Sequence, residues 1–158
     1  MTRVAEIMTE NPVTVQPSQS IDTAITLMRQ GNFRRLPVVE NGRLVGIVTD
    51  RDMRRATNSP ILLHEKWYDN FLLEHIEVGA CMTPNPVTLS PDADVLEAAV
   101  TMRSRKVGGI PIVRGDVLVG IITETDLLDH LIELLEVEQS NQAPTLSLIH
   151  ISEPTRPY

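Results

Sequence analysis

The sequence predicts an α/β fold of the α+β type, in which two β-α-β-β-α repeats pack sheet to sheet as a pseudo-two-fold pair. Three observations predict it: an internal repeat, an amphipathic helical stripe in each copy, and two apolar strands joined by a tight turn in each copy. A single repeat would leave the apolar face of its sheet in water, whereas a second repeat covers that face.

The internal repeat begins with residues 8–14, MTENPVT, which match residues 82–88, MTPNPVT. The offset from Met8 to Met82 is 74 residues, and it persists without a gap through each copy. Because chance does not keep register over such a length, the match indicates a duplication. Further pairs at the same offset are Pro37 and Pro111, Gly46 and Gly120, Thr49 and Thr123, and Asp52 and Asp126.

The first long helix of each copy is predicted by apolar residues at positions i, i+3, i+4 and i+7. Ser18 and Asp92 precede the two stripes and are the predicted N-caps, and Gly31 is the predicted end of the first helix. The stripes are Ile21, Ala24, Ile25 and Met28 in the first copy, and Val95, Ala98, Ala99 and Met102 in the second.

The strands of each copy flank a tight turn. In the first copy, apolar runs at 36–39 and 44–48 are joined by Asn41-Gly42, a strong signal for a two-residue β-hairpin. A short extended segment is expected before each helix, and a second helix after the last strand. The second-copy turn is Gly115-Asp116, the extended segments are 13–15 and 87–89, and the final helices begin near Thr49 and Thr123.

These elements predict repeat 1 at residues 1–56, a linker helix at 57–80, repeat 2 at 81–138 and a tail at 139–158. Within the tail, residues 146–156 (LSLIHISEPTR) resemble the conceptual translation of a sequencing adapter. We therefore expect the tail to be disordered or artefactual and a further C-terminal domain to be missing. A natural flexible terminus is the alternative.

Composition and charge narrow the class of protein. Hydrophobic residues make up 42% of the chain and aromatic residues only 3%, so we expect an aliphatic core. The net charge of −7 argues against nucleic acid as the main partner, since phosphate backbones require a basic surface. One cysteine, no signal-like N-terminal segment and no long apolar run favour a soluble, cytoplasmic protein without a membrane partner.

No pattern typical of an enzyme is present. His64, His75 and His130 are not at metal-ligand spacings, and Cys81 has no evident histidine partner. Neither G-x-G-x-x-G nor a Walker loop occurs. We expect no catalytic residue, no metal site and no covalently bound cofactor.

The segments GIVTDRD at 46–52 and GIITETD at 120–126 carry the most informative motif. Each places a threonine at a strand end and an aspartate three residues later, where a helix begins. Such a T-x-x-D capping box satisfies free backbone N–H groups at the helix start. The same geometry attracts phosphate, and the carboxylate can accept hydrogen bonds from both hydroxyls of a ribose. The structural and the ligand-binding interpretations are compatible.

Three motifs in each copy together resemble the CBS (cystathionine-β-synthase) domain pair. They are M-T-x-N-P-V-T at the start, RRLPVV or GGIPIV in the middle, and G-I-h-T-x-x-D, with h hydrophobic, at the end. The resemblance covers residues 3 to about 135. Residues 59–76 are similar to the linker of acetoin-utilisation-type CBS proteins, some of which carry a C-terminal ACT domain.

The resemblance implies a regulatory, energy-sensing (Bateman) module that is not an enzyme. It implies a homodimer that binds an adenosine nucleotide, AMP, ADP or ATP, in clefts between the repeats, and S-adenosylmethionine stays an open choice of ligand. One alternative is a dimerisation or interaction module whose clefts stay empty. Another is a regulatory fragment of a larger enzyme, transporter or ACT-domain protein.

Matching positions in the family implies two clefts, each with its T-x-x-D from one copy and its other wall from the other copy. Arg34 and Arg35 would add positive charge to the first cleft, whereas Gly108 and Gly109 add none to the second, so we expect tighter nucleotide binding in the first. A solvated strand edge is the alternative role for the two arginines. The first set is Thr9, Val13, Thr14, Phe33, Arg34, Arg35, Thr123 and Asp126, and the second set is Thr49, Asp52, Thr83, Val87, Thr88, Val107, Gly108 and Gly109.

Overall fold

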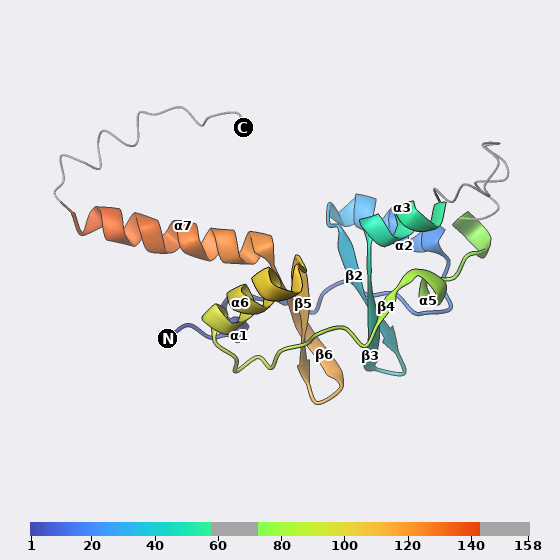
Figure 1. Cartoon of the computed structure of the whole chain (residues 1–158), viewed down its shortest axis with the longest axis horizontal. Helices are drawn as coiled ribbons and strands as arrows, with labels where there is room; N and C mark the ends of the chain where they lie inside the picture. Colours follow the sequence, from blue (N-terminus) through green and yellow to red (C-terminus); the bar gives the residue numbers. More distant parts are fainter. Residues whose placement is uncertain (58–72, 143–158) are drawn as a thin grey trace, which may run out of the picture.

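The structure is a computed structural model that describes residues 1–57 and 73–142. Most of the predicted linker helix and the whole adapter-like segment lie outside the described residues. Within them, one order of elements occurs twice (Figure 1). The first set is α1 (Val4–Ile7), β1 (Thr9–Glu10), α2 (Ile21–Gly31), β2 (Arg35–Glu40), β3 (Arg43–Thr49) and α3 (Asp50–Thr57). The second set is α5 (Val78–Cys81), β4 (Thr83–Pro84), α6 (Val95–Arg105), β5 (Gly109–Arg114), β6 (Val117–Thr123) and α7 (Glu124–Ser140).

Each repeat contains one antiparallel hairpin at the predicted place, formed by β2 with β3 and by β5 with β6. The two hairpins meet where Arg43 lies opposite Val117, so the described strands join into one antiparallel sheet. Asn41 and Gly42 have φ angles of 51° and 78°, the left-handed conformations that a type I′ turn requires. The predicted fold class of two related α/β units is confirmed.

The first strand of each repeat pairs with the other repeat. Thr9 of β1 lies opposite Ile121 of β6, and Thr83 of β4 lies opposite Ile47 of β3. The sequence did not predict this exchange, because a strand of two residues carries no alternating pattern. The exchange joins the two repeats by backbone hydrogen bonds and places the start of each repeat beside the T-x-x-D motif of the other.

The predicted extended segments at 13–15 and 87–89 are reduced to isolated parallel bridges, from Val15 to Val38 and from Leu89 to Ile112. In the first of these, the Val15 N–H donates to the Pro37 carbonyl at 3.1 Å, and the Val15 carbonyl accepts from the Val39 N–H at 2.8 Å. Between β1 and Val15, the Asn11 N–H still donates to the Val119 carbonyl of β6 at 3.4 Å, whereas residues 12–14 take no part in the sheet.

The hydrophobic core divides into two clusters, one for each repeat. Val78 of α5 belongs to the cluster of the first repeat, and Val4 of α1 belongs to that of the second, so the exchange extends into the core. Both side chains are fully buried. The other buried members are aliphatic or methionine, as the composition predicted: Val15, Ile21, Ala24, Met28, Leu36, Val38, Val48 and Met53 in one cluster, and Ala98, Met102, Ile110, Ile112 and Ile122 in the other.

Helices α2 and α6 begin two residues later than predicted. Ser20 caps α2 and Asp94 caps α6, and each side chain accepts a hydrogen bond from a backbone N–H of the first turn. The predicted caps, Ser18 and Asp92, are wrong because each lies in a turn, closed by the Gln19 N–H to the Gln16 carbonyl at 3.1 Å and by the Ala93 N–H to the Ser90 carbonyl at 3.0 Å. An isolated bridge at Ser20 and another at Asp94 then precede the helices. The predicted apolar stripes nevertheless face the core.

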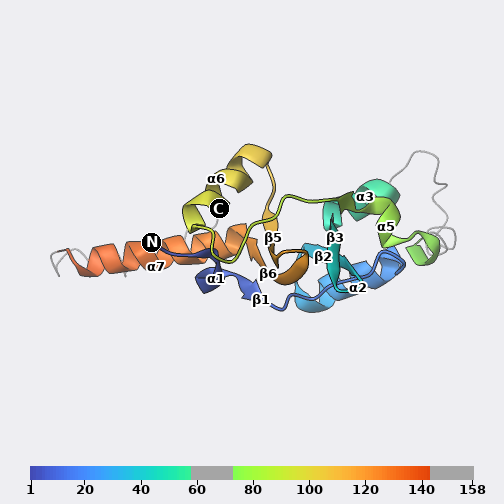
Figure 2. The same ribbon diagram turned by 90° about the horizontal axis from the view of Figure 1, so that it is seen from below.

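The last helix, α7, extends away from the rest of the molecule (Figures 1 and 2). None of its residues is buried, although it is rich in leucine. Leu96 and Val100 of α6 are also exposed. No helix of the described residues is both long enough and apolar enough to span a membrane. The exposed apolar side chains of α7 are Leu128, Leu131, Ile132, Leu134, Leu135 and Val137.

Candidate functional site

The T-x-x-D motif of the second repeat lies at the junction of β6 and α7. The Thr123 N–H donates to Oδ2 of Asp126 at 2.9 Å, and the Thr123 hydroxyl donates to the same oxygen at 3.1 Å. The Asp126 N–H donates in turn to Oγ1 of Thr123 at 3.4 Å. This reciprocal arrangement is the capping box that the spacing predicted. Because both bonds to the carboxylate use Oδ2, its other oxygen takes no part in the cap.

The first repeat has the same motif at the junction of β3 and α3. The Thr49 N–H donates to Oδ2 of Asp52 at 2.9 Å, and the Asp52 N–H donates to Oγ1 of Thr49 at 3.1 Å. The two capping boxes are therefore matched structural devices. Any difference in ligand binding between the two clefts has to come from the residues around them.

In each repeat, a backbone hydrogen bond joins the start of the last helix to the residue that precedes the first strand of the hairpin. The N–H of Asp50 donates to the Arg34 carbonyl at 2.8 Å, and the N–H of Glu124 donates to the Gly108 carbonyl at 3.0 Å. Positions 34 and 108 are the equivalent positions of the two repeats. These bonds hold Arg34 and Gly108 beside the first residues of α3 and α7.

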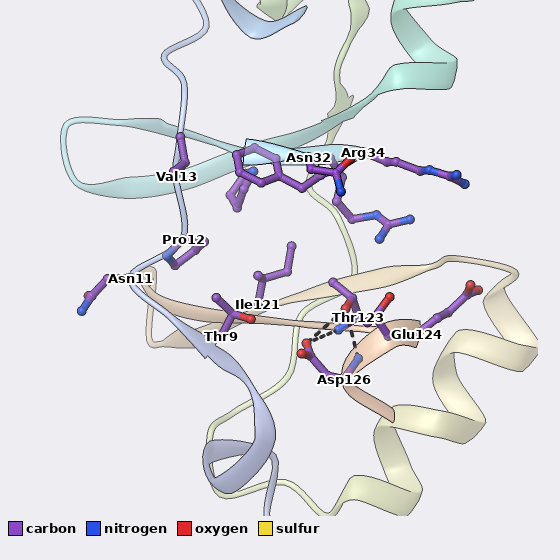
Figure 3. A pocket seen from close by; sticks show the side chains of 14 residues that line it. Thr9, Asn11, Pro12, Val13, Asn32, Arg34, Ile121, Thr123, Glu124 and Asp126 are labelled. Atoms are coloured by element: carbon purple, nitrogen blue, oxygen red, sulfur yellow. Dashed lines mark hydrogen bonds between the residues drawn. The ribbon is translucent and has the colours of Figure 1, made fainter. Parts of the chain in front are cut away.

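A cavity of about 700 Å³ lies between the repeats, with Thr123 and Asp126 on one wall and Arg34 on the facing wall (Figure 3). The volume is in the range of small-molecule sites in proteins. β1 and the loop after it close one side. The lining residues are Thr9, Asn11, Pro12, Val13, Asn32, Phe33, Arg34, Arg35, Pro37, Ile121, Thr123, Glu124, Thr125 and Asp126.

The structure brings together every residue expected in the first cleft except Thr14. Thr14 is exposed and does not line the cavity. The next residue, Val15, is fixed in the bridge to β2 and is buried in the core of the first repeat. Thr14 remains a predicted ligand contact that this cavity does not include.

Sequence reasoning missed several residues of the cavity. Asn32 follows Gly31, the last residue of α2, and ends the helix in a left-handed conformation with φ of 54°. A helix end was predicted there, but not that asparagine takes the left-handed position. Asn11 also has a positive φ, of 48°, in the N-P step of the first motif. The other missed residues are Pro12, Pro37, Ile121, Glu124 and Thr125.

The two arginines that line the cavity differ in their exposure to solvent. Arg34 is exposed and Arg35 is partly buried. Burial lowers the pKa of the Arg35 guanidinium, while the carboxylates of Glu124 and Asp50 oppose this effect and the neighbouring Arg34 adds to it. The partly buried Arg35 is thus influenced by one acidic group from each repeat.

None of the residues expected in the second cleft lines the cavity described above. Instead, the Arg35 side chain lies against Gly108 and Gly109. A Cβ added at Gly108 would be 2.5 Å from Nη2 of Arg35, and one added at Gly109 would be 2.5 Å from Cδ of Arg35. The glycine pair leaves the space that this arginine uses. The remaining residues expected there are Thr83, Val87, Thr88 and Val107.

Among the described residues, no group of three His, Cys, Asp or Glu side chains is arranged to hold a metal ion. His64 and His150 lie outside the described residues. Cys81 ends α5 and is partly buried, and burial raises the pKa of its thiol, with a further contribution from Asp52. The polar side chains that line the cavity can accept and donate hydrogen bonds, and its arginines can pair with anions.

The fold and the cavity define a tandem-repeat module with a small-molecule cavity between its repeats. The family model of the CBS domain matches residues 4–59 and again residues 77–133. The chain belongs to the CBS domain family, as the sequence motifs predicted.

Three similar proteins match this chain over almost the whole of their own length. A CBS domain-containing protein of Dictyostelium discoideum is 39% identical over 135 residues, which are 84% of this chain and 93% of that protein. The crystal structure of a protein from Vibrio cholerae assigned to acetoin utilization (AcuB) has a TM-score of 0.75 at 31% identity, and the match covers 90% of this chain and 99% of that one. The structure of CBSX2 in complex with AMP has a TM-score of 0.72 at 26% identity, covering 84% and 98%. The predicted likeness to acetoin-utilisation-type CBS proteins is confirmed.

Proposed function

We propose that this chain is a regulatory module that binds an adenosine nucleotide in the cleft between Asp126 and Arg34. The observation that carries the proposal is the arrangement of the capping box of Thr123 and Asp126 opposite Arg34 and Arg35, across a cavity of about 700 Å³. A ribose acceptor on one wall and guanidinium groups on the other match the two polar parts of a nucleotide. The AMP complex of the similar protein CBSX2 supports this ligand class.

Each part of the nucleotide has a proposed partner. The oxygen of Asp126 that the cap leaves unused accepts from the ribose hydroxyls, and the side chains of Arg34 and Thr123 bind the phosphate. The base lies against the apolar wall of the cavity, which is formed by Val13, Pro12, Pro37 and Ile121.

The two arginines on one wall of the cleft favour phosphate-bearing ligands over S-adenosylmethionine. The sulfonium of S-adenosylmethionine is a cation that would lie near Arg34 and Arg35, and like charges at short range repel. AMP, ADP and ATP instead bring negative charge to that wall. We infer that affinity depends on the phosphate rather than on adenosine alone.

Regulation follows from the position of the cleft between the two repeats. A ligand that contacts Arg34 of the first repeat and the α7 start of the second stabilises one relative arrangement of the two repeats. We place the module in the cytoplasm, where a partner domain or protein reads that arrangement, and we assign it no catalytic step.

We propose further that the module is a homodimer formed through α6 and α7. The exposed leucines of α7, with Leu96 and Val100 of α6, form an apolar surface that a second copy would cover. α7 carries acidic side chains throughout and no lysine or arginine, whereas α6 ends with Arg103 and Arg105, followed by Lys106. Two copies in antiparallel arrangement would pair the acidic helix of one with the basic helix end of the other.

Calorimetric titration with AMP, ADP, ATP and S-adenosylmethionine tests the nucleotide proposal. Asp126→Ala is expected to weaken nucleotide binding about 10- to 100-fold, the loss of a hydrogen-bonded charged group. Asp52→Ala is the matched control, because it removes the same kind of helix cap from the other repeat. Unchanged affinity in Asp126→Ala, or tighter binding of S-adenosylmethionine than of any nucleotide, would contradict the proposal.

A further inference from the structure

The walls of the cavity between the repeats carry negative as well as positive charge. In the described part of the chain, its charged lining residues are Arg34 and Arg35 from the first repeat and Glu124 and Asp126 from the second. The Asp126 carboxylate is held in the capping box with Thr123. Glu124 takes no part in that box and is exposed, so its carboxylate is a charge of the cavity that helix capping does not explain.

Glu124 differs from its equivalent in the first repeat, Asp50, in the cations available to it. Asp50 pairs with Arg54 of its own helix, with Nη2 of Arg54 at 3.3 Å from Oδ2 of Asp50. By the repeat offset, the residue of α7 at the position of Arg54 is Leu128, and α7 contains no lysine or arginine. The first acidic residue of α3 is therefore paired within its helix, whereas that of α7 can meet a lysine or arginine only outside its helix.

The side chains of Glu124 and Arg35 approach the same glycine from the two repeats. A Cβ added at Gly108 would be 2.5 Å from Nη2 of Arg35 and 3.4 Å from Oε1 of Glu124. Of the neighbouring charges, the Glu124 carboxylate has the largest effect on the pKa of the Arg35 guanidinium, which it raises against the effect of burial. The charges of Arg35 and Glu124 therefore offset each other beside Gly108.

Glu124 lies at the end of the cavity to which the phosphates of a bound nucleotide would extend. Figure 3 shows Arg34 and Glu124 toward one end of the cavity and Val13 toward the other. With the base beside Val13 and the ribose at Asp126, a phosphate chain runs toward Arg34 and Glu124. Glu124 is also the first residue of α7, where an acidic side chain offsets the partial positive charge of the helix N-terminus. A phosphate beyond the first would thus approach a carboxylate.

We propose that Glu124 is a specificity-determining residue that makes the cavity prefer nucleoside monophosphates to nucleoside triphosphates. This inference rests on the proposed nucleotide-binding function. The phosphate of AMP binds at Arg34 and does not reach the Glu124 carboxylate. The additional phosphates of ATP lie beside that carboxylate, and the charge of Arg35 is already offset there, so like charges repel. Affinity therefore falls in the order AMP, ADP, ATP.

Calorimetric titrations with AMP, ADP and ATP test the inference, in buffer with EDTA because a divalent cation would screen the phosphates. The wild-type chain is expected to bind AMP about tenfold more tightly than ATP, with ADP between them. Glu124→Gln should raise ATP affinity about tenfold and AMP affinity less than about threefold. Glu124→Asp keeps the charge and should keep the preference for AMP. Asp129→Asn is the matched control, since Asp129 is an exposed carboxylate of α7 that does not line the cavity.

The outcomes separate this inference from the proposed function. An unchanged ratio of ATP to AMP affinity in Glu124→Gln overturns the inference and leaves the proposed function intact. So does a wild-type chain that binds ATP at least as tightly as AMP. An equal gain in ATP affinity in Asp129→Asn also overturns it, because the net charge of the chain would then set the preference. Failure of AMP, ADP and ATP to bind to the wild-type chain overturns the proposed function together with the inference.

Discussion

Thr9 lies opposite Ile121 in the antiparallel pair of β1 and β6, so the first segment of repeat 1 is part of the sheet of repeat 2. The contact continues into the core, where Val4 is fully buried in the cluster of the second repeat. The Val4 N–H donates to the Ala93 carbonyl at 2.8 Å, which fixes α1 against the segment before α6. The N-terminal residues therefore support the repeat that holds Asp126.

Val4→Ala is expected to lower the free energy of unfolding by about 2 kcal/mol, from roughly 0.8 kcal/mol for each buried methylene equivalent and the cavity that remains. Urea unfolding followed by circular dichroism measures this change. Val78→Ala is the matched variant, since Val78 is equally buried in the cluster of the first repeat. If Val4→Ala left the free energy of unfolding unchanged while Val78→Ala lowered it, α1 would not support the second repeat.

The thiol of Cys81 should react slowly at mildly alkaline pH in the folded protein. Burial, and then the negative charge of Asp52, raise its pKa, so less of it is thiolate than in the unfolded chain. Asp52→Asn removes the smaller cause and should shift the pH dependence of alkylation by iodoacetamide part of the way toward lower pH. Because the folded pKa is the raised one, the neutral thiol stabilises the fold below the unfolded pKa. That stabilisation is lost as pH rises through the folded pKa.

Mass-spectrometric rates of Cys81 alkylation over a pH series measure the shift, with the urea-unfolded chain as the reference. Asp22→Asn, on α2, is a control carboxylate that takes no part in the shift at Cys81. An alkylation midpoint in the folded wild type at or below that of the unfolded chain would be incompatible with a buried thiol beside Asp52.

The capping boxes were predictable because they are local. Thr123 and Asp126 are three residues apart at the end of an apolar run, and that spacing alone fixes which backbone groups they can reach. The hairpin turn at Asn41-Gly42 is predictable for the same reason. The internal repeat predicted the overall arrangement, because two copies of one unit with an apolar sheet face are expected to pack against each other.

The features that escaped prediction are contacts between residues far apart in the chain. Nothing in the letters around Thr9 indicates Ile121 as its partner, because the pairing is decided by how the two repeats pack. The contact of Arg35 with Gly108 was missed for the same reason. Aligning the two repeats placed arginines at the positions of glycines, but it did not show that the Arg35 side chain lies against Gly108. The predicted N-caps were wrong because Ser20 and Asp94 form bridges to Glu77 and to Arg3, residues far away in the chain, and the helices begin only after these bridges.

The proposed dimer predicts that charge on the apolar face of α7 produces monomers. Leu131 and Leu135 are 48% and 46% exposed, so Leu131→Asp with Leu135→Asp should leave the single chain folded while removing the surface that a second copy covers. Light scattering after gel filtration should give a dimer for wild type and a monomer for the double variant. Glu133→Gln, on the same helix, is the control. A wild-type chain that is monomeric at high concentration would refute the dimer through α6 and α7.

The exposed Arg34 should matter for the phosphate and for nothing else in the ligand. Arg34→Gln is expected to weaken AMP binding about three- to fivefold, the scale of a solvent-exposed ion pair, and to leave adenosine binding unchanged. The effect should grow from AMP to ATP as the ligand charge increases, and added salt should reduce the wild-type affinity more than that of the variant. Calorimetry at two salt concentrations measures both effects. Arg43→Gln, at the hairpin turn, is the matched control for an exposed arginine. If Arg34→Gln weakened adenosine as much as AMP, the arginine would be shaping the cavity rather than binding the phosphate.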